Sequence, residues 1–350
     1  MCDAERGSGA KAMLADLQAA GQLGAASQEA VACTPQECRL PVEAALAAQQ
    51  VVVALQRERG TCCWALGSSE GENSFRWQQQ NTDERFQGAK VAISQLLREG
   101  NEAQESRWGA LSRALVEATG ELSPLRKRCG ESLQHRDETL DSEEDFQDAY
   151  AGYCTLIYKV IAAVVGTMPR LRGCNGAPTR LEMRHRLLQY TAEQLGRERA
   201  FLTGHLTRPE TLRLFGMVMQ LAEIIGARKM LLGTASNSQK QGTIVASDTG
   251  LLPALKLMDA APIDPEELAM LESVEHRAMN SRKVDPPAVT EWWCQLTKVI
   301  DKIHQHIMVN VVEFFSQSAG YQSEGGTYQS ECRYHSEAGG YRSEIPEMPL

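Results

Sequence analysis

The sequence has few aromatic residues, almost no strand pattern and no apolar run of membrane-spanning length. Aromatic residues make up 6% of the 350 positions, and the one short β-branched run, GTIVASD at 242–248, falls in a segment that reads as a loop. The longest apolar run, at 154–168, contains Lys159 and is shorter than the roughly 20 residues that a span needs. The N-terminal residues MCDAERGSGAKAM lack the apolar core of a signal peptide. We therefore expect a soluble, cytoplasmic, helical protein.

The sequence also lacks basic excess and any cysteine framework. Its formal charge is -9 and its pI about 5.4, which argues against broad binding of nucleic acid or of anionic membranes. An anionic ligand would have to be held by a local group of arginines. The ten cysteines contain no Cys-x-x-Cys pair. We predict reduced thiols, no metal site and no cofactor.

Helical periodicity dominates the rest of the chain. The predicted helices cover about 40–66, 74–99, 102–135, 145–168, 179–205, 207–233 and 287–316, and another begins at 263–268. Pro124 is expected to bend or interrupt the third, and capping-box patterns start the helices at 207–210 and 263–268. The predicted fold is all-α, with two up-down four-helix bundles packed side by side, at about 38–170 and 179–316, with a shared long helix as one option.

The two ends of the chain differ from this helical part. Residues 1–37 are predicted to be partly helical or disordered. In the tail, 317–350, Tyr-x-Ser-Glu occurs four times, beginning at Tyr321, Tyr328, Tyr334 and Tyr341. Its Gly, Ser and Glu content predicts disorder and a solubilising role, with phosphorylation or partner docking as the alternatives.

The motif Arg-Glu-Arg occurs twice, at 57–59 and 197–199, and each copy places an arginine on an apolar helical face. Arg59 and Arg199 lie at core positions, whereas Arg57 and Arg197 face about 200° away around the helix. The two stripes that carry the core arginines are Ala48, Val51, Leu55, Arg59 and Cys62, and Leu188, Ala192, Leu195, Arg199 and Leu202.

A buried guanidinium stays charged, so an anion must meet Arg59 and Arg199. One alternative is an internal carboxylate: if 67–73 forms a hairpin turn, Asp83 lies level with Arg59 and pairs with it. In the other, both arginines converge on a shared cavity and hold a small exogenous anion through paired hydrogen bonds.

Other chemistry has weaker support. His304 and His306 are two residues apart, so they face different sides of a helix and are expected to be surface or interface histidines. Cys62 and Cys63 are interpreted as core cysteines, with a thiol activated by Arg59 as the alternative. Glu58 and Glu198 are interpreted as solvated or arginine-paired glutamates; a paired-carboxylate acid/base site is the alternative, but no nucleophile, phosphate loop or metal ligand set accompanies them. We predict that the chain is not an enzyme.

Six segments, in order, resemble the family of nitrate- and nitrite-sensing (NIT) domains over about residues 40–312. They are LQRERGTCCWALGSSEG, QQQNTDERF, LSPLRKRC, YCTLIYKVIAAV, EQLGRERAFLTGHL and VDPPAVTEWWCQLTKVIDKI. The resemblance implies an all-α fold of two four-helix bundles side by side, with nitrate or nitrite bound between them by arginines of the two motif helices.

By position, Arg59 and Arg199 match the family's ligand-binding arginines best, with Arg57 beside them and Arg277 as the counterpart from a late helix. Gln79 stands where the family often has arginine. The output modules common in the family, an RNA-binding antiterminator, a kinase or a nucleotide cyclase, have no counterpart in the sequence.

The sequence thus predicts a non-enzymatic sensor of nitrate or nitrite that signals by reorienting its bundles, through a homodimer, an effector protein or the tail. The alternatives are a structural or adaptor bundle that has lost sensing and acts through its surface or tail, and an incomplete gene product.

Overall fold

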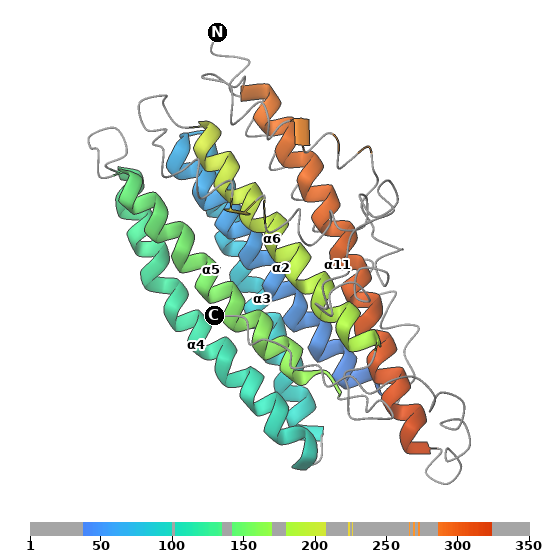
Figure 1. Ribbon diagram of the computed structural model, residues 1–350. Helices are drawn as coiled ribbons and strands as arrows, with labels where there is room; N and C mark the ends of the chain where they lie inside the picture. Colours follow the sequence, from blue (N-terminus) through green and yellow to red (C-terminus); the bar gives the residue numbers. More distant parts are fainter. Residues whose placement is uncertain are drawn as a thin grey trace.

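The computed structural model describes residues 38–99, 102–134, 142–169, 180–207 and 286–323, with isolated positions between 223 and 273. In these residues the ordered elements are six long helices, and no strand is present among them. They are α2 (Arg39–Gly67), α3 (Gly71–Glu99), α4 (Glu102–Gln134), α5 (Ser142–Thr167), α6 (Arg180–Thr207) and α11 (Pro286–Ser323). Their axes run roughly alongside one another in an elongated array (Figure 1). The predicted all-α class is confirmed.

The helix ends differ in places from those predicted. α3 begins at Gly71 and α5 at Ser142, both earlier than expected, and α11 continues to Ser323 instead of ending near Ser316. In the last turns of α11 the Gln317 amide donates to Glu313 at 3.1 Å, one helical turn back, and such local pairs support a polar helix end. Residues 1–37, the capping patterns at 207–210 and 263–268, and the tail from 324 onward lie outside the described residues.

Pro124 lies inside α4, which continues unbroken from Glu102 to Gln134. Proline removes one backbone donor and crowds the carbonyl four residues earlier. Leu122 and Leu125, on either side of it, are buried, so packing holds this part of the helix in place. Of the two predicted effects of Pro124, interruption of the helix was wrong, and a bend stays a prediction.

Helix α2 lies at the centre of the described structure. It packs against α3, α5, α6 and α11, while α3 packs on α4 and α4 on α5, which closes a ring of α2 to α5. On its other side α2 contacts α6 and α11, which also pack on each other (Figure 1). One helix therefore belongs to both groups of helices.

The sequence of α2 explains this central position. From Ala44 onward it presents buried residues on every side, including the adjacent Val51, Val52 and Val53. A helix that is apolar all round needs neighbours all round. Side chains that are not apolar must then find their partners inside the protein.

Helix α5 is long and apolar enough to cross a membrane when judged by length and composition alone, over Glu144–Thr167. Half of its most apolar window is buried inside the protein, against α2 and α4. Its Lys159 binds Glu121 of α4 at 2.7 Å. Buried core helices commonly pass the same test, so it is weak evidence for a span.

A close approach of three helices depends on Gly204 of α6. A Cβ atom at this position would lie 2.3 Å from Cε2 of Phe146 and 3.0 Å from the backbone oxygen of Cys63. Phe146 belongs to α5 and Cys63 to α2. The absence of a side chain at Gly204 therefore sets the distance between these helices.

We expect Gly204→Ala to lower the free energy of unfolding by about 1–3 kcal/mol, because the added methyl group meets a ring and a backbone atom that cannot both move. Gly88→Ala is the matched control on α3, where nothing lies within 4 Å of the new atom. It should raise stability by about 0.5–1 kcal/mol through helix propensity. Urea unfolding of both variants checks this, and equal effects would contradict the packing described.

Candidate functional site

The first Arg-Glu-Arg motif is entirely buried in α2. Arg57 is 3% exposed and Glu58 and Arg59 are 0% exposed. Successive residues of a helix point about 100° apart, so the three side chains meet three different sets of neighbours. Each set contains a group of opposite charge.

Arg59 forms a buried ion pair with Glu193 of α6. Nη2 of Arg59 donates to Oε2 of Glu193 at 3.3 Å, and Nη1 donates to Oε1 of the same carboxylate. Nη1 also donates to Sγ of Cys154 at 3.2 Å. The Gln56 amide donates to the same Glu193 oxygen as Nη2, at 3.0 Å. Burial alone would lower the pKa of Arg59, but Glu193 and its neighbours outweigh it and raise the pKa further. Arg59 therefore stays charged and joins α2 to α6.

The predicted partner of Arg59, Asp83, binds a different arginine. Asp83 accepts from Arg126 of α4 at 2.7 Å. Its side chain is 61% exposed, so it lies on the outer face of α3, whereas Arg59 points from α2 toward α5 and α6. The pairing of Asp83 with Arg59 is thus wrong: Arg59 pairs with Glu193, and Thr82, beside Asp83, binds the backbone oxygen of Ala54, so the hairpin does not bring Asp83 level with Arg59.

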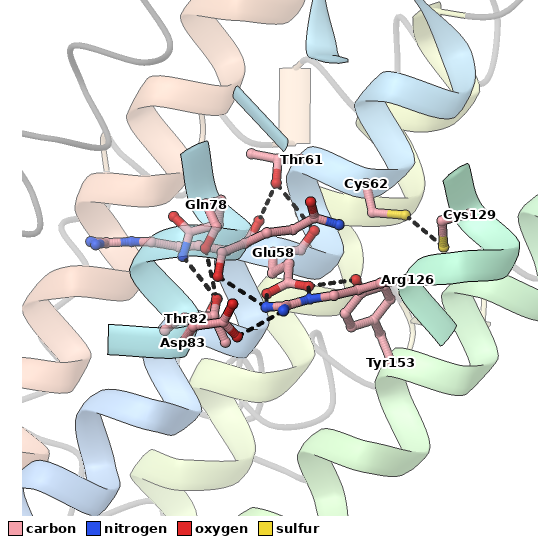
Figure 2. Close-up of polar contacts among 12 residues, drawn as sticks. Glu58, Thr61, Cys62, Gln78, Thr82, Asp83, Arg126, Cys129 and Tyr153 are labelled. Carbon is pink, nitrogen blue, oxygen red and sulfur yellow. Dashed lines mark hydrogen bonds and ion pairs between the residues drawn. The ribbon is translucent and has the colours of Figure 1, made fainter. Parts of the chain in front are cut away.

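Glu58 is the centre of a second polar cluster, which joins α2 to α3, α4 and α5. Arg126 donates to its two oxygens at 2.7 and 2.8 Å, and Tyr153 of α5 donates at 2.8 Å. Figure 2 shows Arg126 reaching between Glu58 and Asp83, with Tyr153 on the same carboxylate. The prediction of an arginine-paired glutamate is confirmed for Glu58.

Arg57 points away from Arg59, as predicted, and meets α11. It donates through Nη2 to Oδ1 of Asp301 at 2.8 Å, and both side chains are nearly inaccessible. The second oxygen of Asp301, Oδ2, has no hydrogen-bond partner among the described residues. This ion pair is therefore held by a single hydrogen bond.

Arg199, from the second motif, is 0% exposed and lies between α2 and α11. It donates to the hydroxyl of Thr297 at 2.8 Å and to the backbone oxygen of Gln56 at 3.2 Å. Its guanidinium carbon lies 4.5 Å from the ring centre of Trp293, a cation–π distance. Helix α11 thus supplies an aromatic face and a hydroxyl to the arginine of α6.

Two glycines allow the arginines to cross between the motif helices. A Cβ on Gly196, beside the second motif, would lie 2.9 Å from Nη2 of Arg59, and one on Gly60, after the first motif, 3.5 Å from Nε of Arg199. Each arginine therefore passes over the glycine of the other motif. In RERG, at 57–60, the glycine follows the motif, and in GRER, at 196–199, it precedes the motif. Each glycine thus lies where the arginine of the other helix passes.

The structure gathers three of the four predicted site arginines at one junction of α2, α6 and α11. The positive charges of Arg57 and Arg199 both act to lower the pKa of Asp301 and the pKa of His304. Arg59 and Arg199 share Gln56, whose amide binds the carboxylate that holds Arg59 and whose backbone oxygen binds Arg199. Arg277 lies outside the described residues.

A polar stripe along α11 completes this junction, and the sequence analysis missed it. Its members are Thr297, Asp301 and His304, spaced four and three residues apart in an otherwise apolar helix. His304 is fully buried, with Nε2 2.9 Å from the Gln56 side-chain oxygen and Nδ1 3.3 Å from the Gln49 amide. The spacing of these polar residues was the signal in the sequence that could have indicated the stripe.

His304 is neutral in this setting. Burial, together with repulsion from Arg57 and Arg199, lowers its pKa to about 3. It lies at a helix interface, as predicted. In the part of the chain that the structure describes, no three His, Cys, Asp or Glu side chains are placed to hold a metal ion.

Cys62 and Cys63 are buried in the core. Sγ of Cys62 lies 3.3 Å from Sγ of Cys129 on α4 (Figure 2). Burial raises the pKa of Cys62 well above its ordinary value, so a positive field from Arg59 does not activate this thiol. The interpretation as core cysteines is confirmed.

A pocket of about 190 Å³ lies elsewhere, between α4 and α5. Its lining includes Glu131, Asp145 and Asp148 with one arginine, Arg128. Three carboxylates around the opening disfavour an anion. This pocket is separate from the arginine junction, and the junction is the better candidate for an anion site.

Comparison with known proteins agrees with this fold. A solved structure, "Structure of the NasR transcription antiterminator", superposes with a TM-score of 0.52 at 14% identity, over 85% of this chain and 73% of that one. At that identity the likeness concerns the fold. No curated protein matches the sequence.

The family comparison is more specific. The sequence matches the family described as nitrate and nitrite sensing over residues 50–307, which is more than half of the chain and includes both Arg-Glu-Arg motifs and the polar stripe of α11. The chain belongs to the family of nitrate- and nitrite-sensing domains.

Proposed function

We propose that this chain is a non-enzymatic sensor that binds nitrate or nitrite at the junction of α2, α6 and α11. The observation that carries the proposal is the meeting of Arg57, Arg59 and Arg199 there, all at most 3% exposed. Three buried guanidinium groups from the two motif helices form a local cationic region in an acidic protein, as an anion site in this chain requires.

The chemistry of the junction suits a small planar anion. A guanidinium group offers parallel N–H donors in one plane, which match two oxygens of nitrate or nitrite. The guanidinium carbon of Arg199 lies over the Trp293 ring, and the hydroxyl of Thr297 and the amides of Gln56 and Gln49 are neutral hydrogen-bonding groups close by. The dry surroundings strengthen each charged contact.

The three arginines have different roles in this proposal. The terminal nitrogens of Arg59 already hold both oxygens of Glu193, so we assign Arg59 to fixing α6 on α2. Arg199 and Arg57 would contact the anion, one from α6 and one from α2. Arg277 stays a prediction for a further contact.

The same geometry gives a route for the signal. An anion held by Arg199 and Arg57 adds a contact between α6 and α2 beside α11, and so changes how α6 and α11 sit on α2. Because Glu58, next to Arg57, binds Arg126 of α4, a movement of α2 reaches the other group of helices. A second copy of the chain or an effector protein would receive the signal.

The same contacts also support one alternative function, that of a structural or adaptor bundle. Arg57 and Arg59 each have a carboxylate partner within the chain, as a structural or adaptor bundle without a ligand would require. The two functions differ in whether an added anion stabilises the protein through Arg199.

We expect nitrate or nitrite to raise the thermal unfolding midpoint of the wild-type chain, measured against chloride and sulfate at matched ionic strength. At about 100 times its Kd the ligand adds roughly 2.7 kcal/mol, or about 5–10 °C for a protein of this size. Arg199→Gln should abolish the rise, because it removes the charged fork while keeping a polar side chain.

Arg98→Gln is the matched control for that experiment, since Arg98 is an exposed arginine at the end of α3 and its loss changes net charge equally. It should keep the full response. A wild-type chain indifferent to all four anions would favour the adaptor function.

A second experiment tests the role assigned to Arg59. Arg59→Gln should cost about 3–5 kcal/mol in the absence of nitrate, because it leaves Glu193 charged, buried and without its cation. Adding Glu193→Gln should recover most of the loss, since two amides can bond to each other without charge. Urea unfolding of both single variants and the double variant measures this, and an additive double variant would contradict the assignment.

A further inference from the structure

Two buried carboxylates face the arginine junction, and they are held very differently. Glu193 has both oxygens engaged, by two nitrogens of Arg59 and by the Gln56 amide. Asp301 receives one hydrogen bond, from Arg57 at 2.8 Å, and its Oδ2 has no partner among the described residues. Asp301 is 4% exposed, so water does not compensate this oxygen from the protein surface.

A half-satisfied buried carboxylate is an unfavourable arrangement in a folded protein, because desolvation of the charge is only partly offset. Asp301 nevertheless lies where the anion of the proposed function would bind, against Arg57 and within the field of Arg199. The Arg57–Asp301 pair is therefore energetically unfavourable and involves an arginine that would bind the ligand. Both properties are expected of an ion pair that the ligand replaces.

We propose that Asp301 is a resident counter-anion: nitrate takes its place on Arg57, and the released Asp301 carboxylate takes up one proton from solvent. This inference rests on the proposed function and adds the regulation of the same site. The Arg57–Asp301 hydrogen bond breaks, hydrogen bonds from Arg57 to nitrate form, and a neutral carboxyl group remains on α11.

Electrostatics explains why the proton should accompany the anion. Nitrate brings a second negative charge into a buried space, and protonation of Asp301 leaves the total charge unchanged. Burial already raises the pKa of Asp301, even though Arg57 and Arg199 act to lower it. Loss of the hydrogen bond from Arg57 and the approach of nitrate both favour the neutral form further.

The neighbours of Asp301 leave it as the group that titrates. Arg57 faces it from α2 and Arg199 from α6, and both act to lower its pKa. On α11 itself, His304 has a pKa of about 3 and is neutral, and Thr297 does not ionise. Among these groups, Asp301 can therefore couple anion binding to pH.

The exchange also gives the ligand a mechanical effect. The Arg57–Asp301 pair joins α2 to α11, and nitrate would break it while it binds. Helix α11 then remains attached to α2 near the pair of Trp64 and Trp293, whose ring centres are 5.6 Å apart. Release at Asp301, with retention at Trp293 and at the His304 contacts with Gln49 and Gln56, would loosen α11 on α2 over this stretch.

The test is calorimetric titration of the full chain with sodium nitrate between about pH 5.5 and about pH 7.5 at fixed ionic strength, a range in which nitrate stays ionised. We expect Kd to weaken by up to about tenfold per pH unit as pH rises, with uptake of up to one proton per nitrate. Proton uptake is read from the difference in apparent enthalpy between two buffers of unlike ionisation enthalpy.

Asp301→Asn should bind nitrate more tightly than wild type at about pH 7.5 and lose the pH dependence. Asp83→Asn removes a carboxylate from the other side of α2, where it binds Arg126, and should keep both the affinity and the pH dependence of wild type.

The outcomes separate this inference from the proposed function. Nitrate binding by the wild type with a constant Kd and no proton uptake would overturn the role of Asp301 and leave the sensor in place. No binding to wild type or to Asp301→Asn at any pH would overturn the sensor as well. Proton uptake is measured on the wild type, so the test holds even if Asp301→Asn fails to fold.

Discussion

A guanidinium group buried between helices needs a carboxylate or another anion close by to compensate its positive charge. The described structure depends on this constraint at Arg59. Glu193 supplies the charge, Gln56 satisfies the same carboxylate, and Gly196 leaves room for the arginine to cross. Breaking the pair leaves an uncompensated charge on each side. The Arg59–Glu193 pair therefore helps to fix α6 on α2, together with the Gln49–Gln189 hydrogen bonds and the close approach at Gly204.

The neighbours of Arg59 extend the same principle to the rest of the protein. Glu58 binds Arg126 of α4 and Tyr153 of α5, and Arg126 in turn binds Asp83 of α3. Arg57 forms an ion pair with Asp301 of α11. Three consecutive residues thus connect one central helix to both of its groups of neighbours. An apolar helix of the same length would pack as well, but it would not require any particular partner on any face.

The sequence predicted the helices and the burial of Arg59 and Arg199, because the three- and four-residue spacing records which face of a helix is apolar. It predicted that Arg57 faces elsewhere for the same reason. It failed on the partners: Asp83 is neither level with Arg59 nor on the same face, and Glu193 comes from a helix whose position depends on tertiary packing. The roles of Asp301 and His304 could not be predicted for the same reason, because they depend on where α11 packs against α2. The family resemblance indicated the family, which the family comparison confirms and which no periodicity could show.

The contrast between the two carboxylates bears on how such a protein can combine rigidity with response. A pair with every oxygen bonded resists exchange, since an incoming anion must replace several hydrogen bonds at once, and Glu193 is held in this way. A carboxylate bound at one oxygen loses less when it is displaced, and Asp301 is held in that way. If both pairs were saturated, Arg57 and Arg59 would both be structural, and the anion contact proposed for Arg57 would be lost. If neither were, α6 would not stay in register with α2. A sensor built on buried arginines therefore needs one permanent pair and one exchangeable pair, and this chain has one of each kind at the same junction.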